Sequence, residues 1–136
     1  MALQASLNTF AGNPLDRASD RRVDEAWLAE KLDDPQSLAI ALWNGKPLVE
    51  DGSAKGAVQI AYLRADMARE LALGQERLAF MGLWKDTAVF AVDLEGGADP
   101  AEGPLKGLGR FEDLRAMAMR LPSADAAILA TAKSLF

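Results

Sequence analysis

The sequence lacks two residue types that often carry chemistry, because none of its 136 residues is a cysteine or a histidine. Without cysteine it can form neither disulfides nor thiolate metal sites, and without histidine it lacks the commonest metal ligand and general base. A serine or threonine nucleophile would need a lysine or a carboxylate as its base, and no serine or threonine stands in a recognisable nucleophile motif. We therefore do not expect a hydrolase of the serine or cysteine type.

Long apolar runs and basic clusters are also missing. No apolar run approaches the roughly 20 residues of a membrane-spanning helix, and residues 1–13 lack the basic start and apolar block of a signal peptide. The net charge is -5, with no block of lysine and arginine, which argues against a surface that coats nucleic acid. We expect a cytoplasmic protein whose domain binds neither membranes nor nucleic acid.

What the chain does contain is the composition of a globular domain. Half of its residues are hydrophobic and 26% are charged, an ordinary balance for a soluble protein. A length of 136 residues is enough to bury one core and short for two. We therefore predict one domain over residues 1–136.

The clearest pattern is a pair of apolar runs within residues 77–94. Residues 78–84 and 88–94 are apolar, aromatic and β-branched, and the polar triplet Lys85-Asp86-Thr87 separates them. Such runs around a short polar connection are typical of an antiparallel hairpin. Because both runs are nearly all apolar rather than alternating, we predict two central strands covered on both faces.

A second hairpin is predicted earlier in the chain. Residues 38–43 and 46–49 flank Asn44-Gly45, a pair that supplies the positive φ of a tight hairpin turn. Pro47 cannot donate to a strand ladder, so we expect the second strand to lie at a sheet edge there.

Helices are predicted on either side of this hairpin. Asp24 can cap a helix that runs to about Leu32, with a proline just beyond its end. After an alternating strand at residues 58–63, a short helix is indicated by apolar residues every four positions, with Gly74 as its C-terminal cap. These apolar residues are Leu63, Met67 and Leu71.

The last third of the chain predicts a loop and two helices. Residues 95–109 are rich in glycine and have no period, so we expect a flexible loop. Pro122 separates two amphipathic helices, and Ser123 can cap the second. Their apolar stripes are Phe111, Leu114, Ala118 and Leu121, then Ala124, Ile128, Ala132 and Leu135. The whole predicts an α+β (α/β layered) fold with about five or six mostly antiparallel strands and three or four packed helices.

Two segments could in principle hold a ligand. Residues 93–102 loosely resemble a calcium loop, but Pro100 and the residue at the middle ligand position spoil the match. We interpret them as a solvated acidic loop. Residues 103–110 could offer backbone N–H groups to a phosphate, with Lys106 and Arg110 adding charge, although they lack the known phosphate-loop patterns. We interpret the three tryptophans as core or subunit-contact residues rather than a base-stacking platform: Trp27, Trp43 and Trp84.

Three stretches together resemble a known domain. They are Phe10-Ala-Gly-Asn-Pro-Leu-Asp-Arg17, Leu42-Trp-Asn-Gly-Lys-Pro-Leu48 and Phe111-Glu-Asp-Leu-Arg115. In order and spacing they are similar to the N-terminal domain of the NADH pyrophosphatase branch of the Nudix hydrolases. The resemblance implies a rudimentary Nudix-like fold that precedes a four-cysteine zinc ribbon and a catalytic Nudix domain. It also implies a homodimeric enzyme that splits NADH or NAD, and in some members NAD-capped RNA, at the diphosphate with divalent metal ions, giving nicotinamide mononucleotide and AMP from the dinucleotides.

The catalytic signature of that family is missing from this chain. A Nudix box needs several glutamates on one helix, because these hold the metal ions that bridge the diphosphate. The nearest string is Arg69-Glu-Leu-Ala-Leu-Gly74, in which Leu73 and Gly74 occupy glutamate positions, and Tyr62 stands where the upstream glutamate belongs. The resemblance therefore assigns no catalytic, cofactor-binding or metal-binding residue here. Zinc and magnesium or manganese are expected only in the downstream domains.

Seven motif residues are predicted to have a structural role. The polar ones are expected to tie the N-terminal segment to the first C-terminal helix by hydrogen bonds and ion pairs, with substrate contact as the alternative. The seven are Phe10, Asn13, Pro14, Asp16, Arg17, Asp113 and Arg115.

The function expected from the resemblance is that of a non-catalytic N-terminal scaffold and dimerisation domain of an NAD(H) diphosphatase. Two alternatives stay open. One is a free-standing interaction or regulatory module with a degenerate Nudix-like fold. The other is an independent nucleotide-binding domain.

Overall fold

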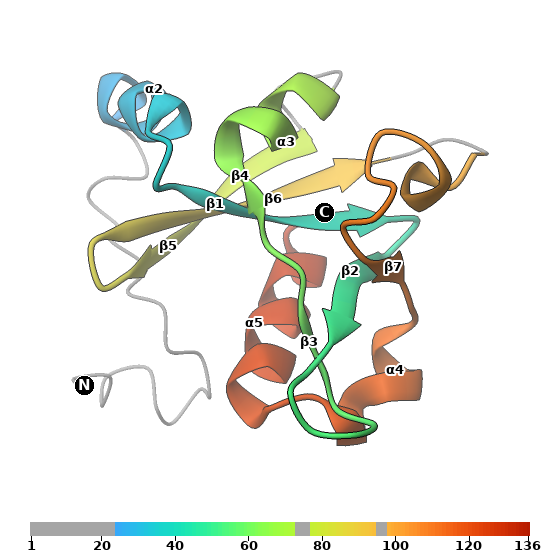
Figure 1. Ribbon diagram of the computed structural model, residues 1–136. Coiled ribbons are helices and arrows are strands. Elements are labelled where there is room, and N and C mark those ends of the chain that lie inside the picture. The colour runs from blue at the N-terminus through green and yellow to red at the C-terminus, as the bar shows by residue number, and fades with distance from the viewer. Residues whose placement is uncertain (1–23, 73–76, 95–97) are drawn as a thin grey trace.

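The computed structural model describes residues 24–72, 77–94 and 98–136. Its centre is a sheet of seven strands with the main order β3-β2-β1-β6-β5, beside which β4 pairs with β1 and β7 with β2 (Figure 1). The strands are β1 (Leu38–Trp43), β2 (Lys46–Asp51), β3 (Val58–Ile60), β4 (Leu63–Arg64), β5 (Leu78–Trp84), β6 (Thr87–Leu94) and β7 (Arg110–Phe111).

Helices cover both faces of this sheet. In Figure 1, α2 and α3 lie above it, and α4 and α5 lie below. The helices are α2 (Glu25–Asp33), α3 (Ala65–Leu71), α4 (Leu114–Met117) and α5 (Ser123–Ser134), with 3-10 turns η2 (Pro100–Glu102) and η3 (Ala118–Arg120). Of the strand pairs described, only β1 with β6 is parallel. The predicted α+β layered fold with a mostly antiparallel sheet is confirmed.

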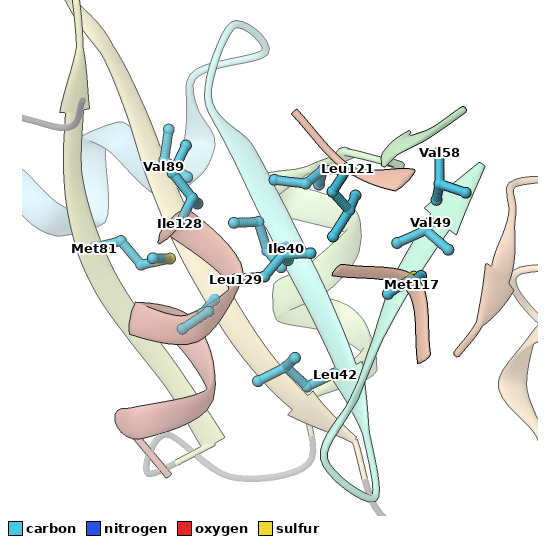
Figure 2. Close-up of a cluster of buried hydrophobic side chains, with 13 residues drawn as sticks. Ile40, Leu42, Val49, Val58, Met81, Val89, Met117, Leu121, Ile128 and Leu129 are labelled. Atoms are coloured by element: carbon cyan, nitrogen blue, oxygen red, sulfur yellow. The ribbon is translucent and has the colours of Figure 1, made fainter. Parts of the chain in front are cut away.

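Strand β1 contributes to the cores on both faces, because successive side chains of a strand point to opposite sides. Ile40 and Leu42 join the cluster beneath the sheet, where Leu129 of α5 is also fully buried. Figure 2 shows these side chains together. Ala39 and Ala41 join the opposite cluster, which α2 and α3 cover. The apolar run of β1 is thus explained by two covered faces.

The predicted helix at residues 24–32 and the hairpin predicted around Asn44-Gly45 are confirmed. Asp24 is the N-cap of α2, and its carboxylate accepts a hydrogen bond from the Trp27 N–H at 3.0 Å. Asn44 and Gly45 have φ values of 51° and 81°, the conformation that their sequence favours in a tight turn. The hairpin at residues 78–94 turns at Lys85, with a φ of 48°.

The prediction of two central strands is confirmed for β6, and within the described residues it does not hold for β5. β6 pairs with β1 and with β5, whereas β5 stands last in the strand order of the described residues. An apolar run indicates that the faces of a strand are covered. It does not indicate which edge is paired, because edge pairing uses backbone groups that every residue carries.

The prediction that Pro47 marks a sheet edge is also wrong. β2 pairs with β1 at Lys46 and Pro47, with β7 at Leu48 and Val49, and with β3 from Val49 to Asp51, so that β3 and β7 lie on opposite sides of it. Proline is accommodated because its carbonyl still accepts a hydrogen bond from the Glu112 N–H at 3.2 Å, just beyond the end of β7. Only the donor that proline lacks is lost from the ladder.

The strand expected at residues 58–63 is divided into two parts. β3 ends at Ile60, the Ala61 N–H donates to the Leu48 carbonyl at 3.2 Å, and β4 then pairs with β1 instead of β2. This crossing brings the chain to α3, which begins at Ala65 rather than at Leu63. The predicted cap Gly74 lies outside the described residues.

The C-terminal helices differ from the prediction in detail. Phe111 belongs to β7 rather than to a helix, and the helical turns α4 and η3 end before Pro122 as expected. Ser123 was the wrong cap, because Pro122 holds the N-cap position without a side-chain hydrogen bond. In α5 the buried stripe includes Leu129 and leaves Ala124 exposed.

The described part of the predicted loop, residues 98–109, contains a 3-10 turn and a buried side chain. Asp99 caps η2 by accepting a hydrogen bond from the Ala101 N–H at 2.8 Å, and Leu105 is fully buried. One apolar side chain anchors the segment, which glycine content alone could not reveal. Residues 95–97 lie outside the described part of the chain.

Candidate functional site

The nearest match to a Nudix box lies on α3, which begins directly after β4. Ala65 and Ala68 bury one side of this helix against the sheet. Arg69 places Nη2 2.7 Å from Oδ1 of Asp33 on α2. The arginine of the apparent box therefore joins two helices, while Glu70 is exposed to solvent.

The remaining acidic side chain of α3 is also committed to a local partner. Asp66 lies 2.6 Å from Arg64, and the hydrogen bond from this guanidinium holds the pKa of Asp66 below its usual value. In the ranges that the structure describes, no three acidic side chains gather in a way that could hold a metal ion. Leu73 and Gly74 lie outside those ranges. The acidic side chains that the structure describes therefore do not fit a divalent cation that bridges a diphosphate.

Tyr62 occupies the position of the upstream Nudix glutamate, between β3 and β4. Burial raises its pKa to about 12, and the negative charge of Asp125 adds to the effect. A tyrosine phenol is already neutral near pH 7 at its ordinary pKa, so Tyr62, which is 39% exposed, does not supply the charge of a carboxylate ligand. Asp125 itself accepts a hydrogen bond from the Ile60 N–H at 3.1 Å, which links α5 to β3.

The acidic segment 93–102 uses two of its carboxylates for structure. Asp93 pairs with Arg77 at 2.6 Å, and Asp99 caps η2. Both roles are those of ordinary ion pairs and caps.

Four backbone N–H groups of the glycine-rich segment 103–110 donate to carbonyls in or just before the segment. The N–H groups of Gly103 and Leu105 both donate to the Pro100 carbonyl, and those of Lys106 and Leu108 donate to carbonyls of the same segment. A phosphate loop requires such N–H groups to point at the ligand. These donors are therefore not free for a phosphate.

Gly109 accounts for part of that glycine content through packing. It has a φ of +148°, and a Cβ added there would lie 2.6 Å from the carbonyl oxygen of Val49. Only glycine allows the backbone to come so close to β2. Sequence reasoning missed this role, because the partner strand lies far away along the chain.

Arg110, the predicted charge of that segment, is held by acidic neighbours. Its Nη1 lies 3.0 Å from Asp51, and its Nε pairs with Glu112. Glu112 also pairs with Arg120 at 3.2 Å. The hydrogen bond to Glu112 raises the pKa of Arg110 further above its ordinary value. The cluster fastens β7 to β2 and η3, and leaves Arg110 already neutralised.

The motif at residues 111–115 has a local structural explanation. Asp113 is the N-cap of α4, and its carboxylate accepts a hydrogen bond from the Arg115 N–H at 3.0 Å. Both side chains are exposed. The contacts predicted between this motif and the N-terminal segment stay a prediction. The remaining motif residues lie outside the described residues: Phe10, Asn13, Pro14, Asp16 and Arg17.

Two of the tryptophans pack within the fold. Trp27 meets Phe80 edge-on at 5.3 Å between ring centroids, and Trp43 lies 5.8 Å from Phe111. Trp84, at the end of β5, is 50% exposed.

An apolar hollow lies between α2 and the β5–β6 hairpin. It is lined by Glu25, Leu28, Ala29, Leu32, Leu78, Phe80 and Phe90. Of these residues only Glu25 is ionisable. Such a lining offers shape and apolar surface but few groups that could orient a charged dinucleotide.

The layered arrangement of mixed sheet and helices is that of a Nudix-like domain. The family model described as the NADH pyrophosphatase-like rudimentary NUDIX domain matches residues 36–136, from the segment after α2 to the last residue. The chain belongs to this family, and the resemblance drawn from its motifs is confirmed. No curated protein matches the chain. Among the described residues, no helix combines the length and apolar character needed to cross a bilayer.

Proposed function

We propose that this chain is the non-catalytic N-terminal scaffold and dimerisation domain of a cytoplasmic NAD(H) diphosphatase. Other domains of that enzyme would hydrolyse NADH or NAD to nicotinamide mononucleotide and AMP. The family match supports the placement in such an enzyme.

The observation that carries the non-catalytic role is the chemistry of α3 and the residues after it. Where the metal-binding helix of a Nudix enzyme offers several glutamates, this chain has Arg69 engaged by Asp33 and then Leu73 and Gly74. Such side chains cannot provide the negative charge that divalent cations require.

The zinc and the magnesium or manganese of the parent enzyme are assigned to the downstream domains. A four-cysteine ribbon needs thiolates, and this chain has no cysteine. The coding sequence beyond Phe136 tests this assignment directly. A cysteine-rich ribbon followed by a Nudix box is expected there. A stop codon would instead favour a free-standing interaction or regulatory module.

The dimerisation role is supported by Trp84, a large aromatic side chain that remains half exposed at the tip of the β5–β6 hairpin. Exposed aromatic residues of this kind are enriched in protein interfaces. Sedimentation velocity on the purified chain should show a dimer, and Trp84→Ala should shift it toward monomer. A monomer at every concentration would contradict this part of the proposal.

A further inference from the structure

We draw no further inference here: the strongest candidate, the apolar hollow between α2 and the β5–β6 hairpin, is an open apolar face, and nothing in the structure shows what covers it.

Discussion

The two faces of the sheet are built differently. Beneath it, bulky aliphatic side chains of the strands meet α5, which buries Ile128, Leu129 and Ala132. Above it, alanines such as Ala39 and Ala41 are combined with the aromatic rings of Phe80 and Phe90 in a second buried cluster. α2 on this upper face has no fully buried residue.

The buried clusters that hold the fold together are distinct from the glutamates that distinguish a Nudix enzyme. Each face carries a buried apolar cluster, and burial is the dominant favourable term in folding. The upper face carries α3, which holds the nearest match to a Nudix box. We infer that the fold persists without those ligands because both clusters are built from apolar side chains.

The largest contrast is expected between two leucine truncations. Leu129→Ala should lower the free energy of unfolding by about 3 kcal/mol, because it opens a cavity in a closed core. Leu28→Ala on α2 should cost about 1 kcal/mol, because that side chain is only partly buried. Denaturant unfolding of both variants measures the difference. Equal losses would mean that α2 is as integral to the core as α5.

A glycine pair gives the next largest effect. Gly109→Ala should cost about 2–4 kcal/mol, because the new methyl group meets the Val49 carbonyl oxygen and the backbone is strained. Gly107→Ala is the matched control, since its φ is +85° but its Cβ would meet nothing within 4 Å. It should cost only about 1 kcal/mol. Thermal unfolding of both variants measures the difference. Equal melting temperatures would contradict a role for the close approach of Gly109 to Val49.

The cap of α4 should contribute less. Asp113→Ala should cost about 1 kcal/mol, because the helix loses an N-cap acceptor, while Asp113→Asn should retain most of the stability. Arg115→Ala keeps the backbone N–H that donates to Asp113, so it should change stability by less than about 0.5 kcal/mol. Chemical denaturation of the three variants distinguishes these cases. A large loss in Arg115→Ala would show that its side chain has a structural role of its own.

The smallest effect is expected for the ion pair between Asp33 and Arg69, the arginine of the apparent Nudix box. Arg69 and Asp33 are partly exposed, and such pairs contribute about 0.2–1 kcal/mol, less at high salt. A double-mutant cycle with Arg69→Ala and Asp33→Ala, measured at low and high salt, isolates the coupling. A coupling of several kcal/mol that salt does not weaken would contradict this estimate.

Local features of the fold were predictable from the sequence, whereas pairings between distant segments were not. Asn44-Gly45 identifies a turn because the turn requires a positive φ that these residues adopt easily. Asp24 identifies a helix start for a similarly local reason. The last place of β5 in the strand order of the described residues, the neighbours of Pro47 and the close approach of Gly109 depend on strands that are remote in sequence.

The same division applies to the candidate site. The missing glutamates of the Nudix box can be read directly from Leu73 and Gly74, because a metal ligand is a property of one side chain. The engagement of Arg110 by Asp51 could not be predicted, since it depends on β2 and β7 lying side by side. The sequence alone therefore left phosphate binding possible, whereas in the structure Arg110 is already paired with acidic side chains.

Incubation of the purified chain with NADH and magnesium or manganese tests the central claim most directly, with release of AMP and nicotinamide mononucleotide as the readout. We predict no release above that of a matched sample without protein. Sustained turnover by the homogeneous chain, abolished by a metal chelator, would contradict the assignment of a non-catalytic domain.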